Sequence, residues 1–282
     1  MTSTYQFRLG FDRDSDRNRD LLPFRRLPEI LRRSGYETAI FGKWHLGTED
    51  TGDDFPRAFG FDEYAIWERP PHRVRDGRYR NAVLRSSRTP TPVDAGDYAP
   101  DFLNEQVVEF VRRERAAPCF LYYPTLLVHR PEHTPPGGDD SRIEGPRSRF
   151  AAMVAMLDEG VGSLARAVAE RESARDTLLL FASDNGGTER AGGDKGALTD
   201  GGTRVPCIVH WRGCRDPGRR TDALVDFSDL LPTLCAVAGC APEHVGRGDG
   251  QSFAAHLTEG APAPRSWVFS DWDGESFVRE RS

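Results

Sequence analysis

The sequence predicts an α/β fold in which helices sandwich a mixed, largely parallel β-sheet. Three observations lead to this prediction. Apolar runs typical of strands alternate along the chain with segments of helical spacing. One run, TLLLFAS at residues 177–183, is continuously apolar, as in strands that a parallel sheet buries on both faces. Four strand candidates lead into polar, Gly-rich or His-bearing turns, and open α/β sheets bind ligands at the carboxyl ends of their strands.

The first hundred residues are predicted to contribute one helix and one strand to the core. The segment LPEILRRSGY, residues 27–36, has the pattern of a short helix ended by Gly35. A β-type run from Thr38 to Phe41 follows and is closed by Gly42. From Thr48 to about Pro100 the chain is rich in Pro, Gly, Arg and Asp. We expect this part to be a long surface excursion with little core.

The rest of the chain alternates between helix and strand patterns. Helices are predicted over residues 101–113, 150–169 and 228–238, and strands over residues 119–123, 177–183, 205–211 and 267–271. The helix at 150–169 is the clearest, and its apolar stripe is expected to face the core.

Composition excludes some classes of function. The formal net charge of -6 argues against nucleic acid as a partner. No stretch approaches the roughly 18 consecutive apolar residues of a membrane-spanning helix, so no membrane span is expected. The five cysteines form no CxxC pair and no even framework, and we expect ordinary thiols. The first residues contain no readable signal peptide, and the compartment stays open.

Lysine is almost absent from this chain. Of 38 Lys plus Arg residues, only Lys43 and Lys195 are lysine. The two types are not interchangeable, because lysine offers a compact, rotatable point charge where arginine offers a planar fork. The two lysines are therefore candidates for a role that arginine does not fill.

The segment GKWHLG places a cation beside an imidazole. Lys43 and His45 lie two residues apart, so on an extended backbone both side chains point the same way. Such a pair can bind an oxyanion, although a solvated turn would show the same pattern. Another polar turn, SDNGG, follows the strand at 177–183. Its Asp184 and Asn185 offer the carboxylate and amide oxygens that a hard cation prefers, and a plain strand-to-loop turn is the alternative.

Two further candidates lie on turns. His129 lies a few residues past the strand CFLYY, where prolines fix the chain, although a lone histidine is more often structural. Lys195 lies on a Gly-rich loop before the strand at 205–211. The glycines indicate a loop that fits closely against a ligand or a neighbouring strand.

Taken in order, these segments resemble the sulfatase family. The similar segments are GYETAIFGKWHLG, FLYYPTLLVHRP, RFAAMVAMLDEGVGSLARAV, DTLLLFASDNGG, GDKGALTDGGTRVPCIVHWRG, and DFSDLLPTLCAVAG with a later DGQSF. They run from about Leu27 to Phe253, and both lysines fall inside them. The resemblance implies an alkaline phosphatase-like fold, with a sulfatase-type domain over residues 1–265 and the beginning of a smaller subdomain over residues 266–282.

The resemblance also implies a role for each candidate residue. Lys43 would bind the sulfate and the oxygen of the nucleophile, and His45 would hydrogen-bond the nucleophile. His129 and Lys195 would contact the sulfate and assist the departing alkoxide, with His129 the better candidate for the general acid. Asp184 and Asn185 would ligate a divalent metal, usually Ca²⁺ in this family. Sulfate ester cleavage needs such cations, a metal and an acid.

The family's formylglycine-forming residue, a Cys or Ser in a Cys/Ser-x-Pro-x-Arg segment, does not occur in this sequence. The most similar segment, Cys240-Ala241-Pro242, continues with Glu243 and His244 and lies in the wrong place in the order. We therefore expect a chain that is incomplete at both ends and inactive as given. A family-type first strand ending in paired aspartates is also missing. We expect Asp12, Asp14 and Asp16 to lie in a solvated acidic loop rather than a calcium loop, because Arg17 and Pro23 replace the Gly and Glu that a calcium loop needs.

Three functions remain open from sequence. The first is a sulfuric ester hydrolase that acts on a sulfated small molecule or carbohydrate. The second is a non-catalytic sulfatase-like binding protein that keeps the cations of the anion site. The third is a phosphate or phosphonate monoester hydrolase of the same superfamily.

Overall fold

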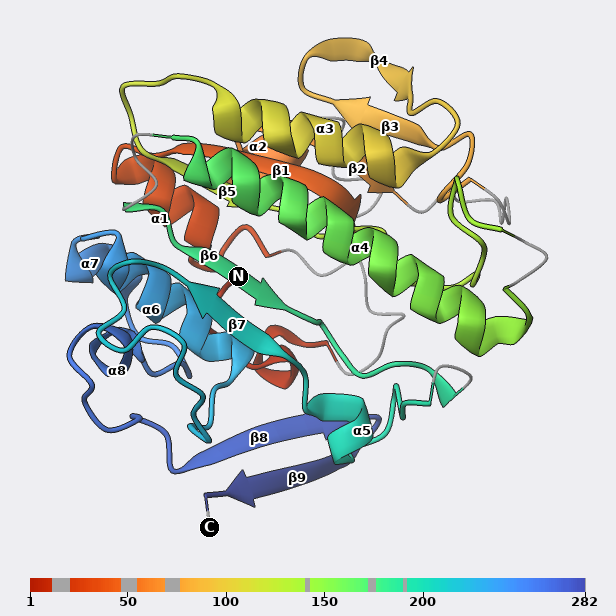
Figure 1. The fold of residues 1–282 in the computed structure, drawn as a ribbon. Coiled ribbons are helices and arrows are strands. Elements are labelled where there is room, and N and C mark those ends of the chain that lie inside the picture. Colours follow the sequence, from red (N-terminus) through yellow and green to blue (C-terminus); the bar gives the residue numbers. More distant parts are fainter. Residues whose placement is uncertain are drawn as a thin grey trace.

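A computed structural model describes residues 1–11, 21–46, 55–68, 77–139, 143–171, 176–189 and 192–281. It confirms the predicted mixed α/β architecture, with helices on both faces of a central sheet (Figure 1). The acidic run of Asp12, Asp14 and Asp16 lies outside the described residues. None of the helices in the described part of the chain is both long enough and apolar enough to cross a lipid bilayer.

In the described part of the chain, the central sheet has five strands in the order β4-β3-β2-β1-β5. They are β1 (Glu37–Trp44), β2 (Glu63–Glu68), β3 (Val83–Ser86), β4 (Thr89–Asp94) and β5 (Cys119–Tyr122). β1 is parallel to both β2 and β5, while β3 and β4 continue the sheet as antiparallel strands. The parallel centre brings the carboxyl ends of β1, β2 and β5 to the same edge.

Side chains of the central strands alternate between two cores. Ala39 and Phe41 of β1 point into a core that they share with Met153 of α4 (Gly145–Ala169), which packs on this face together with α3 (Ala99–Arg112). Ile40 and Trp44 point to the opposite face, toward α2 (Phe55–Phe59). Because strand side chains alternate in direction, each β1 side chain belongs to one layer only.

The expectation that residues 48–100 form a surface excursion with little core is wrong. This stretch holds α2 and the strands β2, β3 and β4. Phe59, Phe61 and Ile66 are fully buried in it. The apolar run of β2 is only YAIW between polar residues. It is buried on both faces, because Ala65 and Trp67 pack in the core on the α3–α4 side while Tyr64 and Ile66 pack in the core on the α2 side.

The predicted strands at 177–183 and 205–211 exist, but they are not buried. They form β6 (Leu179–Ala182) and β7 (Cys207–His210), which pair antiparallel in a separate two-stranded sheet. β6 is half-buried along its length, and Ile208 of β7 is 59% exposed. Among the described residues, β6 and β7 pair only with each other, so the outer edge of each strand has no neighbouring strand beside it.

The predicted helices at 27–36 and 228–238 are confirmed, and they pack together in a third core. They are α1 (Leu27–Arg33) and the pair η5 (Phe227–Asp229) and α6 (Leu230–Val237). The short elements that remain are η1 (Gln6–Leu9), α5 (Asp200–Thr203), α7 (Pro242–Val245) and α8 (Ala254–Thr258).

The C-terminal part forms a β-hairpin, of which only the first strand was predicted from the sequence. The expected last strand is β8 (Trp267–Trp272), and β9 (Glu275–Glu280) returns antiparallel beside it. Asp273 and Gly274 form the turn, both with positive φ. The rings of Tyr5 and Phe7 contact Phe269 of β8, so the start of the chain packs against this hairpin.

Candidate active site

The six residues singled out from the sequence line one pocket: Lys43, His45, His129, Asp184, Asn185 and Lys195. They come from the end of β1, the turn after β5, the end of β6 and the loop between β6 and α5. The pocket is broad and open, with a volume of about 2370 Å³. The fold thus assembles residues that are up to 152 positions apart (195 − 43) at the carboxyl ends of strands.

Close contact between two strand ends positions Lys43. Its backbone N–H donates to the carbonyl of Pro124 at 2.7 Å, just past β5. Gly42 has φ of +131°, and a Cβ at this position would overlap the same carbonyl of Pro124. Only glycine allows this approach, which brings the end of β1 against the turn that leads to His129.

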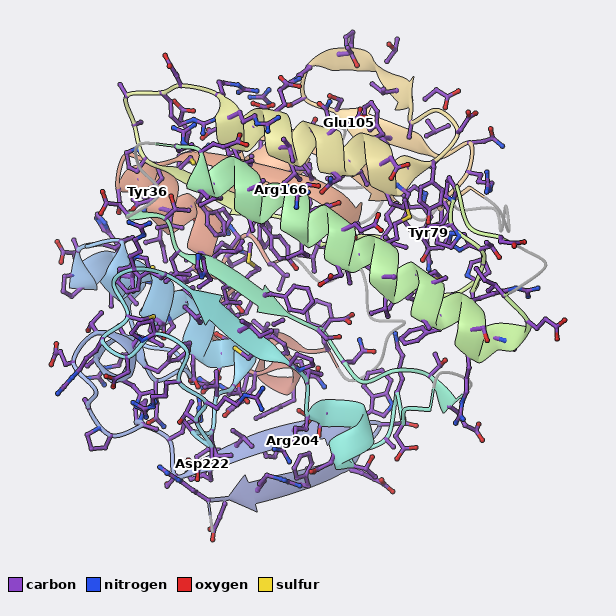
Figure 2. The ribbon with its side chains drawn as sticks, viewed as in Figure 1. Tyr36, Tyr79, Glu105, Arg166, Arg204 and Asp222 are labelled. Atoms are coloured by element: carbon purple, nitrogen blue, oxygen red, sulfur yellow. The ribbon has the colours of Figure 1, made fainter. Side chains whose placement is uncertain are left out.

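The turn that carries His129 is held by residues from the segment just before β3. The Arg78 guanidinium contacts Nδ1 of His129 and donates to the carbonyl of Arg130 at 2.6 Å. The Tyr79 hydroxyl bonds to the carbonyl of Leu126 at 2.9 Å and also to that of His129. Figure 2 shows Tyr79 at one end of the α/β layers and Tyr36, which precedes β1, at the other.

Backbone hydrogen bonds join the SDNGG turn to the loop of Lys195. The amide of Gly186 donates to the carbonyl of Gly202, and the amide of Lys195 donates to the carbonyl of Gly187, both at 2.8 Å. A Cβ on Gly186 would overlap the carbonyl of Gly201. The glycines therefore serve a close fit between two loops, which brings Lys195 beside the Asp184 turn.

Positive charge surrounds the imidazole of His129. Burial and, after it, the nearby cations Arg78, Lys43 and Lys195 together lower its pKa to about 4, against the opposite effect of the Arg130 carbonyl. The ring is therefore neutral at neutral pH. A site with these three cations is arranged to receive an anion, whose negative charge would offset their repulsion.

Asp184 and Asn185 have the oxygen donors that a hard cation prefers, but two residues supply too few of them to complete its coordination. Asp184 is exposed at the end of β6, and its charge contributes, after burial, to the raised pKa of Tyr122 at the end of β5. Calcium takes about six to eight oxygen ligands. Within the described ranges no group of three or more His, Cys, Asp or Glu side chains could hold a metal ion. Asp184 and Asn185 would thus supply only part of the coordination sphere of a metal ion.

Sequence reasoning missed three residues at this end of the pocket: Trp67, Arg78 and Arg130. Nearly all cationic side chains of this protein are arginines, so neither Arg78 nor Arg130 stands out in the sequence. Trp67 lies beside Lys43 in the β1–β2 register, a relationship that only the pairing reveals. Cys240, by contrast, packs in the third core with α1 and α6 and is not among the residues that line the pocket.

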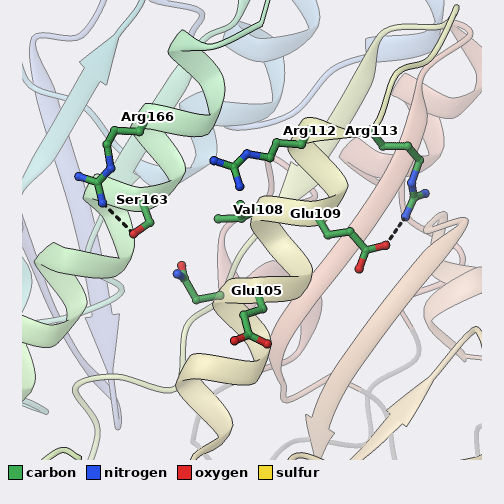
Figure 3. A pocket seen from close by; sticks show the side chains of 8 residues that line it. Glu105, Val108, Glu109, Arg112, Arg113, Ser163 and Arg166 are labelled. Atoms are coloured by element: carbon green, nitrogen blue, oxygen red, sulfur yellow. Dashed lines mark hydrogen bonds and ion pairs between the residues drawn. The ribbon is translucent and has the colours of Figure 1, made fainter. Parts of the chain in front are cut away.

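A second hollow lies between the outer surfaces of α3 and α4 (Figure 3). It is lined by Asn104, Glu105, Val108, Glu109, Arg112, Arg113, Ser163 and Arg166. Its charged side chains have partners nearby. Arg166 donates a hydrogen bond to the Ser163 hydroxyl at 3.0 Å, and Arg113 forms an ion pair with Glu109 at 3.6 Å. It is a groove between two helices with none of the site residues predicted from the sequence.

Known proteins resemble this chain along most of its length. The sulfatase family model matches residues 2–240. Arylsulfatase J of Mus musculus is 28% identical over 265 residues, which cover 88% of this chain and 44% of that protein. Arylsulfatase A of Homo sapiens is 29% identical over 280 residues, 86% of this chain and 52% of that protein. The chain spans about half the length of the curated relatives it matches.

Solved structures show the same fold. The crystal structure of Ps i-CgsB in complex with k-i-k-neocarrahexaose superposes with a TM-score of 0.82 at 24% identity, covering 99% of this chain and 70% of that one. A structure in complex with its substrate D-glucosamine-2-N,6-O-disulfate gives a TM-score of 0.75 at 16% identity, over 99% of this chain and 76% of that one. At these identities the likeness shows the fold alone.

Proposed function

The chain belongs to the sulfatase family, and from this premise we propose that its pocket is the anion-binding part of a sulfuric ester hydrolase site. One observation carries the proposal. Lys43, His45, His129 and Lys195, which lie on three separate segments, all line a single pocket at the carboxyl ends of strands. A sulfate ester offers the negative charge that such a group of cations and N–H donors binds.

Each residue has a proposed role. Lys43 and Lys195 supply point charges to the sulfonyl oxygens, and Lys195 also stabilises the departing oxygen, because charge that develops there needs a nearby cation. His45 hydrogen-bonds the nucleophile. His129 donates a hydrogen bond toward the leaving oxygen and is the candidate for its proton donor once an anion has raised its pKa.

Asp184 and Asn185 are proposed as two ligands of a divalent cation, Ca²⁺, which would neutralise charge on the sulfate group. Asp184 is exposed just past the end of β6, which leaves room for further ligands beside it. The Cys/Ser-x-Pro-x-Arg segment that yields the family's nucleophile is not in the printed sequence. We therefore propose that these 282 residues bind sulfate esters without hydrolysing them, and that residues 1–265 and 266–282 belong to a main domain and a smaller subdomain.

The proposed substrate is the sulfate ester of a carbohydrate or of an aryl alcohol. The pocket continues beyond the proposed sulfate-binding residues, along residues 207–225 and the β8–β9 hairpin, and so leaves room for a substrate that extends beyond the sulfate group. Two of the structural neighbours were solved with a neocarrahexaose and with a glucosamine disulfate, which agrees with a carbohydrate.

The intact mass of the protein from its natural source tests the catalytic part of the proposal. A mass several kilodaltons above 31.5 kDa, with a Cys/Ser-x-Pro-x-Arg peptide in the digest, would support an active sulfatase. A mass of 31.5 kDa would instead favour the non-catalytic binding protein, the candidate that the missing nucleophile segment supports.

Ligand preference tests the anion-binding part. Binding of 4-nitrophenyl sulfate to the 282-residue chain, measured by calorimetry, is expected to weaken at least tenfold in Lys43→Ala and Lys195→Ala. Tighter binding of 4-nitrophenyl phosphate than of the sulfate would favour the phosphate or phosphonate ester hydrolase. Absence of binding by either ester would contradict the proposed site.

A further inference from the structure

Two consecutive residues, Arg78 and Tyr79, hold the turn of His129 from outside the strand that carries it. The Tyr79 side chain is 4% exposed, and its hydroxyl binds the backbone of the turn. The Arg78 guanidinium binds the imidazole itself, at Nδ1, and the carbonyl of Arg130. Tyr79 thus fixes the main chain of the turn, while Arg78 acts on the ring.

The Arg78 guanidinium is itself held in place. Its central carbon lies 4.9 Å from the centroid of the Trp67 ring, within the range of a cation–π interaction. Trp67 is 4% exposed, and its indole N–H donates to the carbonyl of Gly77 at 2.6 Å. In the β1–β2 register Trp67 is the partner of Lys43. The guanidinium is therefore fixed on a buried platform beside the proposed sulfate-binding lysine.

The chemistry of the two groups decides where the imidazole proton lies. A guanidinium stays protonated and only donates, so Nδ1 of His129 must accept from it. A proton on Nδ1 would face this donor. The carbonyl of Arg130 lies 2.9 Å from Nδ1 and also accepts from Arg78 at 2.6 Å, but a proton on Nδ1 directed toward it would leave the guanidinium with no acceptor at the ring. A neutral imidazole carries one N–H, which leaves the proton on Nε2.

We propose that Arg78 is a positioning residue that fixes His129 as the neutral tautomer protonated at Nε2, with the Nε2–H available to an anion in the pocket. The tautomer assignment stands on the contacts of Arg78 alone. The role of the Nε2–H as a hydrogen-bond donor to a sulfate ester rests on the proposed function. Among the described residues, the charged groups that act on the ring are the cations Arg78, Lys43 and Lys195, and they also disfavour the imidazolium form.

An order of events follows for the site. In the empty pocket His129 can donate a hydrogen bond to an anion through Nε2, but it holds no second proton to transfer. Binding of an anion adds negative charge beside the ring and raises its pKa. His129 therefore becomes a proton donor only after the anion is bound, and burial together with the cations around it, Arg78 among them, keeps it out of the charged form until then.

Long-range ¹H–¹⁵N spectra of the histidine rings in the 282-residue chain test the proposal. The wild-type chain is compared with Arg78→Gln, which removes the charge, and with Arg78→Lys, which keeps a cation and a donor. Arg80→Gln is the matched control, since exposed Arg80 lies two residues away over Tyr98 and is not among the residues that line the pocket. Each protein is titrated from pH 8 to pH 5.

Wild type, Arg78→Lys and Arg80→Gln are expected to show His129 neutral and protonated at Nε2 over most of this range. In Arg78→Gln the pKa of His129 is expected to rise by about one unit, with a mixture of tautomers. A wild-type ring protonated at Nδ1 would overturn the proposal even if the Gln variant failed to fold. An unchanged His129 in folded Arg78→Gln would overturn it as well.

Inorganic sulfate added to the wild-type chain separates this inference from the proposed function. If sulfate binds in the pocket, the pKa of His129 is expected to rise and its Nε2 signal to shift. An Nε2-protonated ring that depends on Arg78 but ignores sulfate would support the positioning role and contradict the sulfate site.

Discussion

Arg265 and Asp229 form a fully buried ion pair in which both side chains are 1% exposed. The Arg265 Nε donates to the two carboxylate oxygens of Asp229 at 2.9 and 2.7 Å, and Nη2 donates to one of them at 2.6 Å. Nη2 also donates to the Ser228 hydroxyl and to the carbonyl of Asp249, both at 3.0 Å. The pair therefore joins the segment before β8 to the start of α6.

Loss of one partner from this pair should be costly. Arg265→Ala leaves the Asp229 carboxylate buried without its cation, and we expect the free energy of unfolding to fall by about 3–5 kcal/mol. Urea unfolding followed by circular dichroism measures this change. The control is Arg281→Ala, which breaks the pair with Asp222, where the side chains are 46% and 78% exposed. Exposed pairs contribute about 0–1 kcal/mol, so equal losses in the two variants would contradict this account.

Gly42→Ala should disturb the site more than its small size implies. The new Cβ would overlap the carbonyl of Pro124, and the φ of +131° is one that residues other than glycine rarely adopt. We expect a loss of about 2 kcal/mol or more in the free energy of unfolding, together with weaker binding of 4-nitrophenyl sulfate because Lys43 moves. Gly162→Ala in α4 is the control, since alanine in a helix is favoured by up to about 1 kcal/mol. If Gly42→Ala is as stable as wild type, the close approach of β1 and the Pro124 turn is wrong.

Much of the fold could be predicted because its helices and most of its strands carry local signals. α3 and α4 have clear apolar spacing, and β1 and β5 are apolar runs beside turn residues. β2 was missed because four apolar residues between charged ones do not reveal a central strand, which is defined by its pairing with β1. β9 was missed although Asp273-Gly274 is a strong hairpin signal that the sequence does carry.

The site was predictable to the extent that its residues are unusual in the sequence. Lys43 and Lys195 stand out in a chain of arginines, and the order of the motifs located His129 and Asp184. Arg78 has no such signal, because it is one arginine of a Pro- and Arg-rich stretch. Its contact with His129 exists only once β2 and the following segment fold against the turn after β5.

Lys195→Ala should lower sulfate ester turnover by about 100-fold or more in the protein expressed at its natural length, because it removes a charge that stabilises the transition state. Initial rates with 4-nitrophenyl sulfate measure the effect. Arg33→Ala serves as the control. Its side chain is 64% exposed and pairs with Glu29 at 2.7 Å, and it is not among the residues that line the pocket, so little change is expected. Turnover close to wild type in Lys195→Ala would remove Lys195 from the site.

His129 should make the stability of the chain depend on pH in a defined window. Its pKa is about 4 in the folded protein, against an ordinary value of about 6.5 in the unfolded chain. Between these values the unfolded chain binds more protons at His129 than the folded one. The free energy of unfolding therefore rises with pH, and the contribution of the neutral ring, complete above about pH 6.5, is lost as the pH falls toward 4.

The replacement His129→Asn isolates this contribution, because asparagine does not titrate. Urea unfolding of both proteins at pH 7, 6 and 5 is expected to show a smaller loss of stability on acidification in the variant than in the wild type. The carboxylates of the chain titrate in both proteins, so they cancel in the difference. Parallel pH profiles for the two proteins would mean that burial and the cations around His129 do not lower its pKa in the folded protein, which would contradict the account of a neutral ring.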